Sequence, residues 1–313
     1  MGSTITVSDR VWAQIGSDIT TSFNAITGSC LTGDGTKVFG SSVSSGSDFT
    51  QVGADIDGEA VGDQFGRSVS ISSDGTRVAI GAPRNDGLTG HVRVYEDISG
   101  TWTQVGSDID GEAASDQSGH SVSISSDGTR VAIGALYNDP TTGTNAGHVR
   151  VYEDISGTWT QMGSDIDGES SKDKSGHSVS ISANGTRVAI GAISNAGTVG
   201  SSAGHVRVYE GVLSYGVWVW TKVGSDIDGE ASYDYSGQSV SISSDGTRVA
   251  ISANQNDGAG SNASNTGHVR VFEDDFGSWL QVGSDIDGEA AADQSGYSVS
   301  MSSDGCLLYT SDA

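Results

Sequence analysis

The chain has 313 residues and a formal net charge of −25 at pH 7, with 40 acidic side chains against 15 basic ones. Such an acidic balance argues against nucleic acid and against anionic membrane surfaces as partners. No stretch is apolar enough to cross a bilayer, and the two cysteines, Cys30 and Cys306, give no disulfide framework. We therefore expect no nucleic-acid partner and no membrane insertion.

Residues 1–52 are predicted to form a degenerate first unit. Residues 5–7 predict a third strand of this unit, and residues 11–15 predict a fourth. The dipeptide Asp34-Gly35 indicates a tight turn. We expect the strand at 11–15, which contains Trp12, to complete a truncated last unit, because propellers often close their ring in this way.

Five copies of the sequence D-I-D-G-E follow, and each begins two residues after a glycine: Gly53, Gly106, Gly163, Gly224 and Gly283. A long period built from short alternating segments is typical of a propeller or a related array. The unit length varies only in one loop and one hairpin, which indicates a rigid scaffold with tolerant surface loops.

The unit that begins at Gly53 predicts four antiparallel strands, at 68–72, 77–82, 91–95 and 101–105. The turn Asp74-Gly75 joins the first two, and a variable loop at 83–90 joins the second to the third. One strand face carries Val and Ile and the other carries Ser, Ala and Gly, so neighbouring sheets can pack closely as blades. We expect the first strand to be innermost.

The fold class is therefore predicted to be all-β, a β-propeller of four-stranded antiparallel blades with five to six blades in this chain. The units of this single domain, residues 1–305, are 1–52, 53–105, 106–162, 163–223, 224–282 and the truncated 283–305. Residues 306–313 depart from the repeat, and we expect them to add little to the core. They are either non-native in origin or a divergent final strand; on the first interpretation the chain is a fragment of a longer propeller.

The dipeptide Phe65-Gly66 and the tripeptide Gly81-Ala82-Pro83 resemble the FG-GAP repeat of integrin α-subunit propellers and of many secreted microbial proteins. Weaker versions recur in the later units. The resemblance implies a propeller at the cell surface or outside the cell that serves adhesion or ligand binding, with calcium in some blades. The family's calcium loop is replaced here by a turn with one carboxylate, Asp74, which cannot supply the oxygens that calcium requires.

The D-I-D-G-E segments concentrate carboxylates at one repeated position, and these are the candidate metal ligands: Asp55, Asp57, Glu59, Asp63, Asp108, Asp110, Glu112, Asp116, Asp165, Asp167, Glu169, Asp173, Asp226, Asp228, Glu230 and Asp234. The same spacing recurs from Asp285. Alternating carboxylates around a glycine can surround a hard cation, so calcium is the one cofactor considered. The alternatives are aspartates that fix turns through backbone N–H groups, and ion pairs with repeated arginines such as Arg93; we favour these alternatives.

Other repeated polar and aromatic residues are assigned to the scaffold. One histidine per unit begins the third strand, as His91 does, and is expected to be a hydrogen-bonded edge residue rather than a metal ligand. The tryptophan of the fourth strand, as in Trp102, is expected to cover a blade edge. His120 and His177 occupy a position that holds other residue types in the remaining units, and no catalytic constellation is evident.

The Asn- and Asp-rich loops vary between units and are the candidate partner-binding residues: Asn85, Asp86, Asn138, Asp139, Asn195, Asn256 and Asp257. In a radial blade these loops emerge on the same side as the acidic segments, so we expect one face to carry both. We predict a noncatalytic extracellular or cell-surface module, not an enzyme, that binds a protein or glycan at that face. The alternatives are a polysaccharide-active enzyme with its site in the central funnel, and a purely structural surface or matrix protein.

Overall fold

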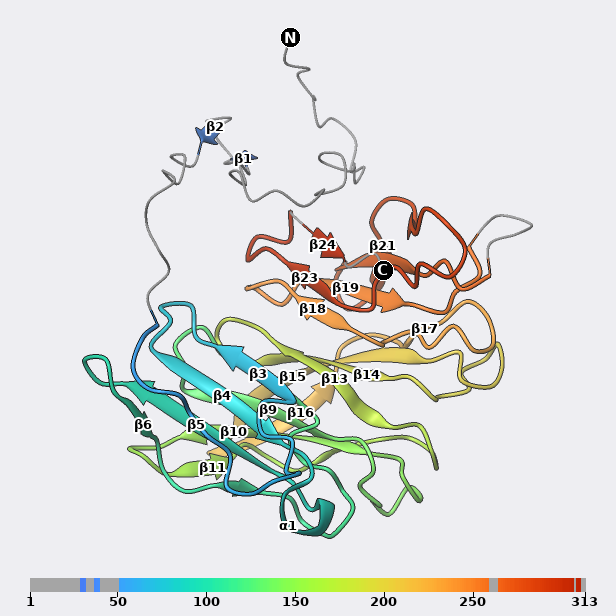
Figure 1. The fold of residues 1–313 in the computed structure, drawn as a ribbon. Coiled ribbons are helices and arrows are strands. Elements are labelled where there is room, and N and C mark those ends of the chain that lie inside the picture. The colour runs from blue at the N-terminus through green and yellow to red at the C-terminus, as the bar shows by residue number, and fades with distance from the viewer. Residues whose placement is uncertain (1–28, 32–36, 40–50, 259–263, 307, 311–313) are drawn as a thin grey trace.

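A computed structural model describes residues 29–31, 37–39, 51–258, 264–306 and 308–310 (Figure 1). Its strand pairs are all antiparallel. The helical segment α1 (Asn85–Leu88) is a single turn in the first variable loop. None of the described helical residues forms a helix that could span a membrane.

Four sheets follow one another along the chain, each with four strands in sequential order and a short fifth strand beside the third. The first sheet consists of β3 (Ser68–Ile71), β4 (Arg77–Ala82), β5 (His91–Asp97), β6 (Trp102–Gln104) and β7 (Ile109–Asp110). The second consists of β8 (Ser121–Ile124), β9 (Arg130–Ala135), β10 (His148–Asp154), β11 (Trp159–Gln161) and β12 (Ile166–Asp167). The third consists of β13 (Ser175–Ile181), β14 (Arg187–Ala192), β15 (His205–Ser214), β16 (Val217–Lys222) and β17 (Ile227–Asp228). The fourth consists of β18 (Val240–Ile242), β19 (Arg248–Ala253), β20 (His268–Asp274), β21 (Trp279–Gln281) and β22 (Ile286–Asp287).

The prediction of an all-β chain built from four-stranded antiparallel blades is confirmed. The first strands of successive sheets, β3, β8, β13, β18 and β23, lie against one another, as expected for the inner edge of a row of blades (Figure 1). The end of each of the four sheets differs from the prediction, because a short fifth strand follows the fourth. Gly106 turns the chain out of the sheet with φ +73°, and Ile109–Asp110 then pairs again with the start of β5. Because Ile109 is buried, part of the D-I-D-G-E segment belongs to the sheet rather than to a loop.

Two shorter sheets complete the described residues. The strands β1 (Ser29–Leu31) and β2 (Lys37–Phe39) pair where the sequence predicts a hairpin. The predicted strands at 5–7 and 11–15 lie outside the described residues. In the fifth blade, β23 (Val299–Met301) pairs with β24 (Leu308–Thr310), and Leu308 packs against the core of the fourth blade. The expectation that the tail adds little to the core is therefore wrong for Leu308.

The hydrophobic core lies between successive blades. In the first junction, Val92 and Val94 of β5 pack in one cluster with Val131 and Ile133 of β9, and all four are almost fully buried. Each such side chain stabilises the fold by about 1.5–3 kcal/mol. The same arrangement recurs at the next two junctions. Burial between blades explains why Val and Ile alternate with small residues along these strands.

Serine and tryptophan side chains join the blades by hydrogen bonds. The Ser68 hydroxyl donates to the carbonyl oxygen of Gly119 at 2.8 Å, and the amide of Ile124 donates to the Ser70 hydroxyl at 3.0 Å. The indole N–H of Trp159 donates to the carbonyl of Val105, in the preceding blade, at 2.8 Å. The periodic serines and tryptophans therefore belong to the blade junctions, as the sequence indicates.

Candidate functional site

The last carboxylate of each acidic segment is buried and fixes a turn. In the second blade, Asp116 is 4 % exposed and accepts hydrogen bonds from the amide of Ala113 at 3.1 Å and from the side-chain amide of Asn138 at 2.8 Å. The same pair of bonds holds Asp63, Asp173 and Asp234. These aspartates are turn formers that also tie the acidic segment to the variable loop.

The asparagines of the variable loops face inward. Their side chains are buried and donate to the aspartates just described; they are Asn85, Asn138, Asn195 and Asn256. The neighbouring aspartates Asp86, Asp139 and Asp257 are exposed. These contacts confirm that acidic segments and variable loops share one face, which we call the loop face. On it, the aspartates are accessible to a partner and the asparagines are not.

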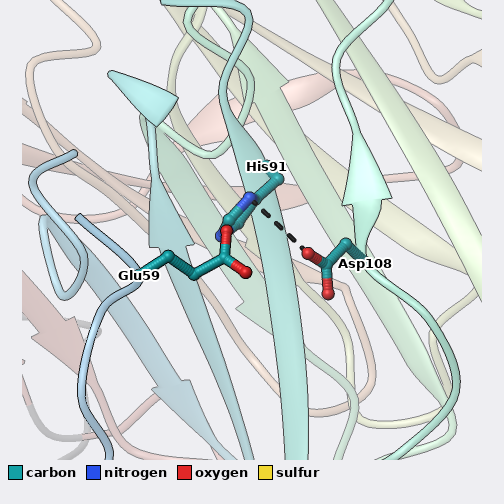
Figure 2. A group of neighbouring side chains, drawn as sticks. All are labelled: Glu59, His91 and Asp108. Atoms are coloured by element: carbon teal, nitrogen blue, oxygen red, sulfur yellow. Dashed lines mark ion pairs between the residues drawn. The ribbon is translucent and has the colours of Figure 1, made fainter. Parts of the chain in front are cut away.

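The structure divides each acidic segment between two blades instead of wrapping it around one point. Glu59 precedes the first strand of the first blade and Asp108 follows its fourth strand. His91, at the start of β5, lies between them (Figure 2). One potential ligand atom from each of the three lies within 4.8 Å of the others. Three further clusters repeat this geometry: Glu112, His148 and Asp165; Glu169, His205 and Asp226; Glu230, His268 and Asp285.

The histidine of each cluster is a buried imidazole, and three of the four have a ring nitrogen without a hydrogen-bond partner. His91 is 2 % exposed, and its Nδ1 lies 3.9 Å from Oδ2 of Asp108 (Figure 2). The Nε2 atoms of His91, His205 and His268 are buried without a hydrogen-bond partner. Burial, aided by the adjacent arginines, lowers the pKa of His148, His205 and His268 to about 4. These imidazoles are neutral at pH 7, which is the form that binds metal ions.

An arginine pairs with carboxylates of each of the first two clusters, but the number of carboxylates that it contacts differs between them. In the first cluster Arg93 donates to both carboxylate oxygens of Asp108, at 2.9 and 2.8 Å, and also pairs with Glu59. The Arg93 bond holds the pKa of Asp108 below its usual range. In the second cluster, Arg150 contacts one of the two carboxylates, that of Glu112, at 3.5 Å. It also donates a hydrogen bond to the backbone carbonyl of Asp110.

The aspartate of the second cluster is therefore held by a neutral group. Asp165 accepts a hydrogen bond from the side-chain amide of Gln161 at 2.6 Å, and Asp285 is held in the same way by Gln281. Asp226 instead pairs with Lys222, at 2.7 Å. The second and fourth clusters thus have the least compensated aspartates, and the ion-pair alternative describes the first cluster best.

The single carboxylate of the turn between the first two strands takes part in the turn itself. In the first blade, Oδ1 of Asp74 accepts hydrogen bonds from the Ser72 hydroxyl at 2.7 Å and from the amide and hydroxyl of Thr76. The Ser72 bond, followed by those from Thr76, lowers the pKa of Asp74 to about 2. This carboxylate is used by the turn, as expected from the departure from the family's calcium loop.

Two groups of functional candidates were not predicted. The cluster histidines were assigned to the blade edge, because the sequence does not show that the glutamate of one unit and the aspartate of the next converge on them. The structure also brings together His120, His177, Arg67 and Lys174 at the inner edge of the loop face. The signal for this second group was present in the sequence, since these residues break an otherwise regular repeat.

Residues 55–95 match the family model of the FG-GAP repeat. The resemblance inferred from Phe65-Gly66 and Gly81-Ala82-Pro83 is thereby confirmed for the first blade. No curated protein matches the chain.

Solved structures with a similar fold include three bacterial proteins. Hydrazine synthase of Kuenenia stuttgartiensis is 15 % identical, with a TM-score of 0.46 over 78 % of this chain and 60 % of that one. The periplasmic gluconolactonase of Pseudomonas aeruginosa is 18 % identical, with a TM-score of 0.47 over 78 % of this chain and 64 % of that one. A putative 6-phosphogluconolactonase of Bacteroides uniformis is 12 % identical, with a TM-score of 0.46 over 91 % of this chain and 68 % of that one.

These similarities concern the fold alone, and the chain spans less than two thirds of the first two proteins. They nevertheless correct one expectation. We expected that the chain is not an enzyme, and that exclusion is wrong, because the structures with this fold include a gluconolactonase and a putative 6-phosphogluconolactonase.

Proposed function

We propose that the protein is an extracellular propeller that binds ligands at its loop face, with divalent cations held in the Glu–His–Asp clusters. The observation that carries this proposal is the fourfold repetition of two carboxylates around a buried imidazole. Each cluster lies beside a variable loop, so a cation there would be placed to bridge the protein and a protein or glycan ligand. The glutamates are 40–48 % exposed, which leaves the clusters open to solvent.

The donor set favours some cations over others. Calcium prefers six to eight oxygen ligands, whereas each cluster offers one nitrogen and the carboxylates of two residues. Imidazole with carboxylate suits first-row ions such as Zn²⁺ and Mn²⁺. The first cluster should bind most weakly, because Arg93 already occupies the space between its carboxylates.

Calorimetric titration with Zn²⁺, Mn²⁺ and Ca²⁺ tests the proposal. The double substitution His148→Gln with Asp165→Asn removes the second cluster and should lower the number of bound Zn²⁺ or Mn²⁺ ions by one. Asp139→Asn is the matched control, because it removes one exposed charge from the same face outside any cluster. Equal binding by the double variant and the wild type would contradict the proposal, as would the absence of binding heat in both.

A second candidate function is catalysis at the inner edge of the loop face. The observation that favours it is the group of unlike polar residues around His120 and His177, since an active site breaks a repeat in this way. Assays for cleavage of acidic polysaccharides, with His177→Gln as the inactive comparison, test this candidate. Equal turnover by the variant would exclude a catalytic role for His177.

A further inference from the structure

One position in the repeat holds a different residue in almost every unit. It follows the glycine that precedes the first strand and is occupied by Arg67, His120, His177, Gln238 and Tyr297. The residues that follow it are Ser-Val-Ser in every unit. Because the first strand begins at the end of the sheet from which the variable loop emerges, these residues lie at the inner edge of the loop face.

Serine bonds between blades bring these residues side by side. Ser68 donates to the carbonyl of Gly119, Ser121 to that of Gly176, and Ser178 to that of Gly237, at 2.7–2.8 Å. Each bond joins the residue after one variable position to the residue before the next. The rings of His120 and His177 lie accordingly in contact, with centroids 5.2 Å apart and planes inclined by 45°.

The charged groups that act on both imidazoles are cationic. Arg67 flanks the pair on one side, and Lys174 comes from the acidic segment of the third unit. The Lys174 position holds Gln or Tyr in the other units. Its ammonium group lies 5.8 Å from the ring centroid of Tyr137. Two cations and two imidazoles thus gather on a chain whose net charge is −25.

The two imidazoles differ little in charge, and one of them has a nitrogen without a hydrogen-bond partner. Nδ1 of His177 is buried without a partner, while the side chain of Gln238 interacts with the same ring. Burial and the neighbouring cations lower the pKa of His120 to about 3 and that of His177 to about 4. Both rings are therefore neutral at pH 7, and each carries one N–H donor. The positive field of Arg67 and Lys174 is complementary to an anion.

We propose that Arg67, His120, Lys174 and His177 form a binding site for an oxyanion, a carboxylate or phosphate group carried by a small molecule or an acidic glycan. The Arg67 guanidinium offers two parallel N–H donors that match such a group, and Lys174 adds a point charge. A bound anion would oppose the field of these cations and raise the affinity of both imidazoles for protons. The site shares no residue with the Glu–His–Asp clusters, so either can exist without the other.

Calorimetry at pH 7 in metal-free buffer tests the site, with inorganic phosphate and glucuronate as probes and glucose as the neutral control. At least one anion should bind, and glucose should not. Arg67→Gln and Lys174→Gln should each weaken binding about tenfold or more. Arg84→Gln, which removes an exposed arginine of the variable loop, should leave it unchanged. Phosphate binding alone would indicate a phosphate ester, and glucuronate binding alone an acidic sugar.

Proton linkage separates a specific site from general attraction. Repeating the glucuronate titration near pH 5, in buffers of different ionisation enthalpy, should show protons taken up on binding, and the uptake should be smaller in a His120→Gln, His177→Gln double variant. Failure of both anions to bind at millimolar concentration would overturn the proposal. So would an effect of Arg84→Gln as large as that of Arg67→Gln, provided that the variants keep the melting temperature of the wild type.

Discussion

The Glu–His–Asp clusters and the inner group around His120 and His177 share the loop face but are built in opposite ways. The clusters repeat the same three residue types four times and hold an excess of carboxylates. The inner group occurs once among the described residues and is cationic. The blade junctions accept Arg, His or Gln at the inner position with the same serine bonds. Packing therefore explains the residues that repeat in every unit. It does not explain the different residues at the inner position, which indicate a ligand.

If repeated residues support the fold, the largest loss of stability should come from a buried one. Asp116→Ala leaves the amide of Ala113 and the side-chain amide of Asn138 without their acceptor. We expect the free energy of unfolding to fall by about 2–4 kcal/mol, because each unsatisfied buried group costs about 1–3 kcal/mol. Urea unfolding measures this, with Asp139→Ala as the exposed control. An equal loss of stability from both substitutions would show that the buried Asp116 supports the fold no more than the exposed Asp139 does.

The inner histidines should make stability depend on pH without being needed for the fold. Their pKa values in the folded protein, about 3 for His120 and about 4 for His177, lie below the ordinary value of 6.5. The unfolded chain therefore binds more protons below pH 6.5, and stability is lost as the pH falls from 6.5 towards 4. Each histidine contributes up to about 1.4 kcal/mol per pH unit.

The double variant His120→Gln, His177→Gln should thus show a shallower fall of stability with acidification than the wild type. Part of the fall should remain, because burial also lowers the pKa of His148, His205 and His268. Unfolding midpoints measured between pH 7 and 4 provide the test. Identical pH profiles would show that the two imidazoles are not buried as described.

A smaller loss of stability is expected from an aspartate that pairs with an arginine in one blade but not in the other. Asp154 accepts a hydrogen bond from Arg77 of the preceding blade at 2.9 Å. Its counterpart Asp97 makes the same turn bond to a glycine amide, but no arginine of the described residues pairs with it. Asp154→Asn should therefore cost about 1 kcal/mol more than Asp97→Asn, as for a partly buried charge pair. Equal melting temperatures would exclude this bond as a stabilising contact.

Much of the fold could be predicted because its information is local. The alternation in 77–82 and the turn at Asp74-Gly75 give β4 with the predicted limits. The strand Ile109–Asp110 could not be predicted, because it depends on pairing with His91 and Val92 after the chain has turned out of the sheet at Gly106. The clusters were missed for a similar reason: Glu59 and Asp108 belong to different units, and only the register of β5 brings them to one histidine.

We infer that the loop face holds two independent sites, one for cations and one for oxyanions. The most direct test is calorimetry of both ligand types on the same two variants. Arg67→Gln should lose phosphate or glucuronate affinity and keep all bound Zn²⁺ or Mn²⁺. His148→Gln with Asp165→Asn should lose one cation and keep the anion affinity of the wild type. Loss of both ligand types in either variant, in a protein that remains folded, would contradict the account.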